Sequence, residues 1–153
     1  MFSQTLEYAL RAVVCLAQQD PKPLTTLHIS ALTHVPSGYL SKVLQSLGKA
    51  QIVSACRGIG GGYKLSIPPG QLTILQVVDA IDPLKRIDCC PLRLQSHGSD
   101  LCPLHHRMDR VLQDAQETFA ATTIADLLND PAHPMPLCET MLAAAAPMDE
   151  KKQ

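Results

Sequence analysis

The chain has 153 residues, a formal net charge of -1 at pH 7, 46% hydrophobic residues and 3% aromatic residues. This length predicts one domain, or one small domain with an appended arm, that is large enough to bury a core. The sequence holds no apolar run long enough to span a bilayer and no basic-then-apolar signal segment, so we expect a cytoplasmic protein rather than a membrane or exported one.

Two helices are predicted at the start of the chain. Residues 3–18 place apolar side chains at three- and four-residue spacing, which indicates an amphipathic helix that ends near Asp20. Glu7 lies near the start of this helix, where an acidic side chain also interacts favourably with the helix dipole. Thr25 can cap a shorter second helix that runs to Thr33.

A third helix is predicted from a capping Ser37 to about Lys49, after a turn at residues 34–36. The polar side of this helix holds Tyr39, Ser41, Lys42 and Gln45. A short helix, a tight turn and a second helix form a helix-turn-helix pattern, which is typical of DNA-binding proteins. Other helical hairpins share the pattern, so it indicates DNA binding without establishing it.

A glycine-rich hairpin follows the third helix and turns the pattern into that of a winged helix. Residues 52–53 and 63–67 predict two strands, with Arg57 and a run of glycines between them. Glycines let a narrow tip approach a DNA backbone, and Arg57 is placed to enter a minor groove. A phosphate-binding loop would need a helix after the glycines, whereas a strand follows here. A purely structural hairpin is the stronger alternative.

Charge is distributed unevenly along the chain. Between Asp20 and Asp79 there is no acidic residue but there are five basic ones, whereas twelve acidic residues outnumber seven basic ones from residue 79 onward. A basic part on an otherwise acidic chain indicates that only this part meets a polyanion such as double-stranded DNA.

The second half of the chain predicts further helices. Thr73 begins a helix that ends near Asp82, and Pro103 begins a long helix that runs to about Ala121. The long helix has one apolar stripe, formed by Leu104, Met108, Val111, Leu112, Ala115 and Phe119. Attached to so small a domain, such a stripe is typical of a dimer interface. We therefore expect a homodimer, whose two-fold symmetry suits a palindromic operator.

A short helix from Thr123 through Leu128 precedes a tail rich in proline and alanine, in which Cys138 has no expected role. The predicted fold is mainly α, a winged helix-turn-helix with a long C-terminal dimerisation helix. Its expected parts are a DNA-binding domain (1–82), a cysteine-containing sensor loop (83–102), a dimerisation helix with a short return helix (103–129) and a flexible tail (130–153).

Residues 88–107 hold three of the six cysteines and three of the six histidines. Thiolates and imidazoles gathered on a segment broken by glycine and proline are the ligands that a transition metal or an iron-sulfur cluster needs. Because the chain shows no export signal, ligands or redox thiols are favoured over structural disulfides. Cys15 lies in an apolar helical pattern and is expected to be a small buried hydrophobic residue.

Four motifs resemble the Rrf2 family of bacterial winged-helix transcription regulators, at residues 7–12, 38–44, 57–65 and 122–127. The resemblance covers about residues 2–129 and implies a homodimer crossed by the long helix, with two winged-helix heads on a palindrome. It implies DNA contacts from the third helix and the wing, namely Tyr39, Ser41, Lys42, Arg57 and Gly58. Their expected positions alone add Gln45 as a contact to a base edge and Lys64 as a contact to a DNA phosphate. Alternatively, both are ordinary solvent-exposed side chains without a role in DNA binding.

Some members of this family bind an iron-sulfur cluster, and the resemblance extends to part of their ligand set. Cys90, Cys102 and His105 match the first cysteine, the last cysteine and a histidine of such members. Ser96 stands where those members have the middle cysteine, and a hydroxyl is a poor substitute for a thiolate.

Some relatives take a further ligand from an acidic residue on the first helix of the partner subunit, and Glu7 stands at that place. Ligation by Cys90, Cys102, His105 and Glu7 favours a [2Fe-2S] cluster, because that cluster type accepts nitrogen ligands. Cys89 and His97 are reserve ligands.

We therefore expect a DNA-binding regulator, acting as a repressor, whose operator affinity is switched by an iron-sulfur cluster in response to redox state, nitric oxide or iron status. A cluster-free regulator with a thiol switch or zinc at Cys90 and Cys102 is an alternative. An enzyme is not expected, because no zinc-enzyme motif and no substrate site is apparent. A dimeric adaptor that binds only protein would show no salt-dependent DNA affinity.

Overall fold

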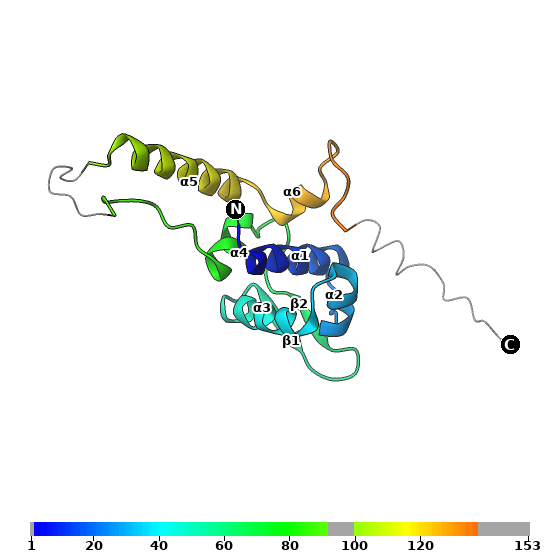
Figure 1. The fold of residues 1–153 in the computed structure, drawn as a ribbon. Helices are drawn as coiled ribbons and strands as arrows, with labels where there is room; N and C mark the ends of the chain where they lie inside the picture. The colour runs from blue at the N-terminus through cyan, green and yellow to red at the C-terminus, as the bar shows by residue number, and fades with distance from the viewer. Residues whose placement is uncertain (1, 92–99, 138–153) are drawn as a thin grey trace.

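The computed structural model describes residues 2–91 and 100–137, and these residues form six helices and one antiparallel sheet of two strands. The elements in chain order are α1 (Gln4–Gln19), α2 (Thr26–Thr33), α3 (Ser37–Lys49), β1 (Val53–Cys56), β2 (Gly62–Leu65), α4 (Ile74–Ile81), α5 (Pro103–Ala121) and α6 (Ile124–Leu128). Helices α1 to α4 and the sheet pack together, whereas the start of α5 projects away from them (Figure 1). The mainly α winged-helix prediction is confirmed. Within the described ranges no helix is both long and apolar enough to cross a membrane.

Side-chain caps determine where most helices begin. The side chains of Ser3, Thr25, Thr73 and Thr123 each accept a backbone N–H of the helix that follows. The prediction that Ser37 caps α3 is wrong, because Pro36 occupies the cap position and Ser37 is the first helical residue. Pro36 is extended, with ψ 132°, and its carbonyl oxygen already accepts the N–H of Leu40 at 3.0 Å.

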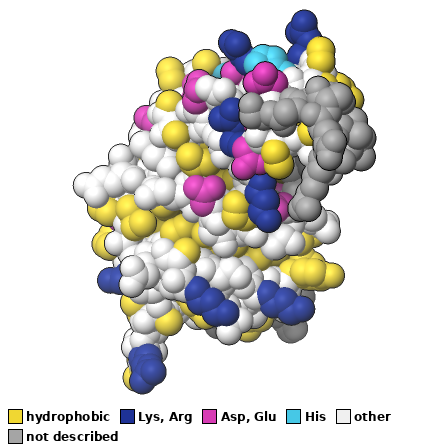
Figure 2. Space-filling view, turned by 90° about the vertical axis from the view of Figure 1, so that its left-hand side faces the viewer, with side chains coloured by type: hydrophobic (Ala, Val, Ile, Leu, Met, Phe, Trp, Pro, Cys, Tyr) yellow, Lys and Arg dark blue, Asp and Glu magenta, His cyan; other side chains and the backbone are white. Residues whose placement is uncertain are grey.

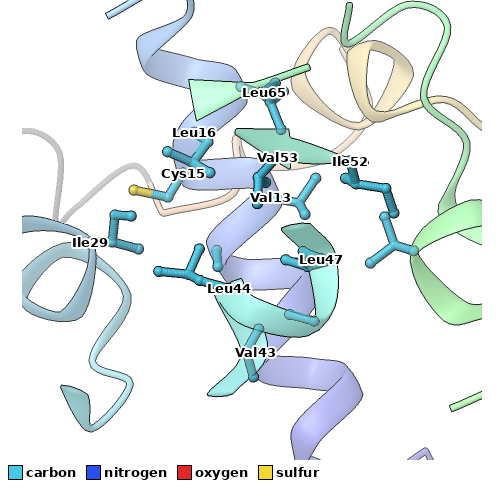
Figure 3. Packing of buried hydrophobic residues seen from close by; sticks show 14 of the residues in the cluster. Val13, Cys15, Leu16, Ile29, Val43, Leu44, Leu47, Ile52, Val53 and Leu65 are labelled. Atoms are coloured by element: carbon cyan, nitrogen blue, oxygen red, sulfur yellow. The ribbon is translucent and has the colours of Figure 1, made fainter. Parts of the chain in front are cut away.

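The core lies between α1, α3, α4 and the sheet (Figure 3). Val13 and Leu16 of α1 and Leu47 of α3 belong to this core, and each of these side chains is at most 1% exposed. Burying a side chain of this size contributes about 1.5–3 kcal/mol. Cys15 is fully buried among them, and burial raises the pKa of its thiol to about 12. The prediction of a buried hydrophobic cysteine is confirmed, and this thiol stays protonated at neutral pH.

The wing is a hairpin in which Val53 pairs with Leu65 and Cys56 pairs with Gly62. Leu24, which precedes α2, exchanges two backbone hydrogen bonds with Tyr63 of β2, at 2.9 and 2.7 Å. These two bonds attach the wing directly to the helix-turn-helix. They also bring the backbone of Gly62 against the carbonyl group of Leu24.

Replacing Gly62 with alanine should destabilise the protein by about 2 kcal/mol or more, a cost in the range known for forced backbone conformations. Gly62 has φ +150°, and a Cβ atom there would lie 2.2 Å from the carbonyl oxygen of Leu24. Urea unfolding followed by circular dichroism measures the change. Gly38→Ala is the matched control, since a Cβ at this helical position meets nothing within 4 Å. We expect that variant to gain up to about 1 kcal/mol. Equal unfolding midpoints for the two variants would show that the Leu24 contact has no effect on stability.

The end of α5 and helix α6 are fixed to the packed helices through the start of α4. The N–H of Ile74 donates to the carbonyl of Thr122 at 3.0 Å, and the N–H of Ile124 donates to the carbonyl of Leu72 at 2.8 Å. Residues beyond α6 also contact α1, because Gln18 Nε2 donates to the carbonyl of Pro136 at 2.6 Å. Residues 130–137, predicted as the start of a flexible tail, are therefore docked at Pro136, and Cys138 with the rest of the tail lies outside the described residues.

Candidate nucleic-acid interface and metal-binding loop

Helix α3 presents a continuous solvent-exposed face. Tyr39, Ser41, Lys42 and Gln45 all lie on this face, and the side chain of Tyr39 is 58% exposed. The opposite face is buried through Leu40, Val43, Leu44 and Leu47, which fixes how the helix is turned. The hydroxyl of Ser41 donates to the carbonyl of Ser37 at 2.9 Å, which leaves its oxygen able to accept a hydrogen bond. The four side chains predicted to contact DNA from this helix are thus together and accessible.

The wing adds a second exposed element beside α3. Arg57 and Gly58 are exposed at its tip, and Gly58 has φ +96°, a conformation that favours glycine. Lys64 is half-buried on β2, opposite Ser54. A groove of about 730 Å³ separates α3 from the wing, and its lining includes Gln45 of α3.

The charged side chains near this interface are of one sign on the face drawn in Figure 2. Lys and Arg side chains lie along its lower part, with no Asp or Glu side chain visible among them, whereas acidic side chains appear higher on the same face. The lower part corresponds to the half of the molecule that holds α3 and the wing in Figure 1. A surface of this sign attracts a polyanion such as DNA.

Two residues of α1 support the exposed face of α3, and neither was predicted. The ring of Tyr8 packs edge-on against the ring of Tyr39 at a centroid distance of 6.2 Å. The Arg11 guanidinium lies 6.0 Å from the centre of the Tyr8 ring, donates to the carbonyl of Thr33 at 3.3 Å and pairs with Glu7 at 2.7 Å. The four-residue spacing of Glu7 and Arg11 could have indicated the ion pair, but not its contact with α2.

The cysteine-containing loop brings two of the predicted ligands together. Cys102 occupies the N-cap position of α5, and its sulfur lies 3.2 Å from Nδ1 of His105. Cys90 is buried at 5% exposure, whereas Cys89 is exposed. His97 and Ser96 lie outside the described residues.

The described residues of one chain do not assemble a complete metal site. In ranges 2–91 and 100–137, no three His, Cys, Asp or Glu side chains lie close enough together to hold a metal ion. Glu7 is a half-exposed side chain on α1, where it pairs with Arg11. The sulfur and nitrogen of Cys102 and His105 do fit part of a [2Fe-2S] site with mixed ligands.

A strap formed by residues 84–87 lies along α5 next to this loop. Both nitrogens of the Arg86 fork donate to the carboxylate of Asp109, with Nε at 2.6 Å, and the N–H of Ile87 donates to the same carboxylate at 2.9 Å. The Arg86 guanidinium and the Ile87 N–H hold the pKa of Asp109 at about 2, so this carboxylate is ionised at neutral pH. Sequence reasoning missed this contact, because the two side chains are 23 positions apart.

The apolar stripe of α5 is exposed over its N-terminal half. Leu104, Met108 and Val111 are 63%, 49% and 67% exposed. The structure describes every residue of α5, and none of them is buried. The C-terminal end of the stripe is partly covered, since Phe119 packs against Phe2 at a centroid distance of 5.4 Å. An exposed apolar face of this kind is typical of an interaction site.

Comparison with known proteins places these features in one family. Residues 2–130 match the Rrf2 family, described as iron-dependent transcriptional regulators. The helix-turn-helix-type transcriptional regulator NsrR of Geobacillus kaustophilus is 30% identical over 133 residues, which cover 82% of this chain and 88% of that protein.

Solved structures share the fold. The structure of T. potens IscR has a TM-score of 0.71 and 22% identity, covering 85% of this chain and 87% of that one. The structure of CymR, the global cysteine regulator of B. subtilis, has a TM-score of 0.69 and 21% identity, covering 83% and 95%.

Proposed function

Because this chain belongs to the Rrf2 family of transcriptional regulators, we propose that it is a repressor that binds a palindromic operator as a homodimer and senses its signal through an iron-sulfur cluster. Its role as a transcriptional regulator is not an enzymatic one. The observation that supports the sensing role best is the Cys102–His105 pair at the start of α5.

DNA binding is assigned to the exposed face of α3 and to the wing. Tyr39, Ser41, Lys42 and Gln45 would enter a major groove, since a helix of this kind presents its first turns to base edges. Arg57 and Gly58 would reach the adjacent minor groove, and Lys64 would contact phosphate. The lower part of the face in Figure 2 supports this orientation, because Lys and Arg side chains lie there with no acidic side chain visible among them.

Dimerisation is assigned to the exposed stripe of α5. The stripe is apolar, lies on a helix whose start projects from the packed domain, and is exposed at Leu104, Met108 and Val111. A second copy of α5 would bury it and would set two winged-helix heads at a fixed separation, as a two-fold operator requires. The proposed parts are thus a DNA-binding domain (1–82), a sensor loop (83–102), a dimerisation segment (103–129) and a tail (130–153).

The cluster would be held by Cys90, Cys102 and His105, with Glu7 supplied by the partner subunit and with Cys89 and His97 in reserve. When bound, a [2Fe-2S] cluster supplies a centre that reacts with oxidants and nitric oxide. The chain's own residues hold the loop to α5 and leave Glu7 as a half-exposed side chain on α1. The signal can change transcription only if the two states of the loop differ in DNA affinity.

Anaerobic purification followed by iron and acid-labile sulfide analysis tests this proposal. We expect a coloured protein with about two irons and two sulfides per site. A variant with alanine at Cys90, Cys102 and His105 should lose the colour and should change operator affinity several-fold. Cys56→Ala is the matched control, because Cys56 is a half-buried thiol in β1, outside the loop. A colourless wild type, or a triple variant with unchanged operator affinity in every redox state, would rule out the cluster as the sensor.

The same Cys102–His105 geometry supports a second candidate. A thiol beside an imidazole at a helix start also suits a redox-active cysteine or a zinc ligand pair. Zinc in place of iron, or operator binding that depends on reductant without any bound metal, would identify this cluster-free regulator.

A further inference from the structure

The strap (residues 84–87) is held by three side chains on successive turns of α5. The Asp109 carboxylate accepts three hydrogen bonds, two from Arg86 and one from the Ile87 N–H, and its side chain is only 14% exposed. One turn further on, Gln113 Oε1 accepts from the same Arg86 guanidinium at 3.2 Å. Bidentate pairing of arginine with a carboxylate is geometrically specific, so this contact fixes the position of the strap as well as holding it.

Contacts beside the Arg86–Asp109 pair fix which residues of the strap lie against which residues of α5. Gln116 Nε2 donates to the carbonyl of Leu84 at 2.7 Å, so the strap is bonded at both of its ends. Gln113 is itself oriented by Glu117, which accepts from Gln113 Nε2 at 2.7 Å. Leu84 also packs against the core, which joins the strap to the winged-helix domain.

The position of the strap limits where Cys90 can lie. Cys90 is three positions after Ile87, and a fully extended stretch of that length spans at most about 10 Å. Asp109 lies four residues after His105 and seven after Cys102, which corresponds to roughly 6 Å and 10 Å along the helix. Cys90 is therefore tethered close to Ile87, which is itself bonded to Asp109 on the helix that follows Cys102 and carries His105.

We propose that Arg86 and Asp109 form a clamp that positions the sensor loop, by keeping Cys90 buried and tethered to the helix that follows Cys102 and carries His105. Neither side chain is a ligand in the proposed site, so both act as positioning residues. The assignment of Cys90 as a ligand rests on the proposed function, but the clamp itself is a property of the cluster-free chain and can be tested there.

The test is cysteine alkylation of the reduced, metal-free full chain, with each thiol followed by mass spectrometry. In the Asp109→Asn variant, alkylation of Cys90 should become at least about tenfold faster, the scale on which residues that support metal ligands act. Cys89 is already exposed and should keep its rate, and Cys15 is fully buried in α1 and should also keep its rate. A faster Cys90 with unchanged Cys15 and Cys89 identifies local release of the loop.

Two control variants sharpen this test. Asp114→Asn removes the same charge from α5, but Asp114 is 65% exposed and lies 4.0 Å from its partner Arg110, so its Cys90 rate should match wild type. Arg86→Gln alone and combined with Asp109→Asn should give similar rates, because both residues belong to one interaction. An unchanged Cys90 rate in Asp109→Asn, or an equal rise for Cys15 and Cys90, would overturn the clamp.

A second measurement connects the clamp to the cluster. In reconstituted protein, cluster absorbance should be lost to a chelator about tenfold faster in Asp109→Asn than in Asp114→Asn. Equal rates of loss would overturn the clamp's role at the cluster. If the wild type binds no iron, the proposed sensing function fails, whereas the alkylation result still decides whether the clamp exists.

Discussion

The Val111→Asp variant should be a monomer at concentrations where the wild type is a dimer, and its operator affinity should fall by at least about a hundredfold. Val111 is 67% exposed in the single chain and lies on the same stripe as Leu104 and Met108. A dimer would bury this position, and burying an unpaired carboxylate costs several kcal/mol. Loss of the dimer also removes one of two half-site contacts, so the effect on DNA exceeds that of a lost side chain. Sedimentation velocity and fluorescence anisotropy with operator DNA measure the two quantities.

Ala120→Asp is the matched control for this variant. Ala120 is also exposed on α5, but it lies nine residues further along the helix, which places it on the opposite side. The control should remain dimeric and should keep its operator affinity. If Val111→Asp is still a dimer with an intact unfolding transition, the exposed stripe is not the interface between subunits.

Arg57→Ala should weaken operator binding by about 1–3 kcal/mol per protomer while leaving the dimer and any bound cluster intact. Arg57 is exposed at the tip of the wing, where it has room to enter a minor groove. Its removal should also reduce the dependence of operator binding on salt concentration, because binding then releases fewer counterions from the DNA phosphates. A salt titration of anisotropy-derived affinities measures both effects.

Arg110→Ala is the matched control for the wing. It removes the same charge from a side chain that is 72% exposed, on α5 rather than on α3 or the wing. Operator affinity should be nearly unchanged in this control. If the two variants weaken binding equally, net charge and not a wing contact explains the loss, and the assignment of Arg57 is wrong.

Local sequence patterns were enough to predict the elements that position the DNA-binding face. Apolar spacing fixed which side of α3 is buried and therefore which side holds Tyr39 and Lys42. Thr73 and Thr123 indicated helix starts because capping depends on residues only three positions apart. The wing followed from its glycines, since few other residues accept the φ values of its tip.

Contacts between distant segments could not be predicted in this way. The Arg86–Asp109 pair and the docking of Pro136 on Gln18 depend on how α5 and α1 are placed by the whole fold. The pairing of Cys102 with His105 is local and was within reach, because one helical turn separates them. A complete cluster site could not be predicted from local sequence, because Glu7 would act from a second chain and His97 lies outside the described residues.

The two backbone hydrogen bonds between Leu24 and Tyr63 have a consequence for how a signal can be read out. They join the wing to the helix-turn-helix, so each head is expected to move on DNA as one rigid body. In a homodimer, the adjustable quantity is then the separation of the two heads, measured along the duplex. One base pair corresponds to about 3.4 Å of helix axis, so a shift of that size at the α5 interface would change the preferred spacer length by one base pair. A signal would thus select operators by the distance between their half-sites, without altering the bases that each head prefers.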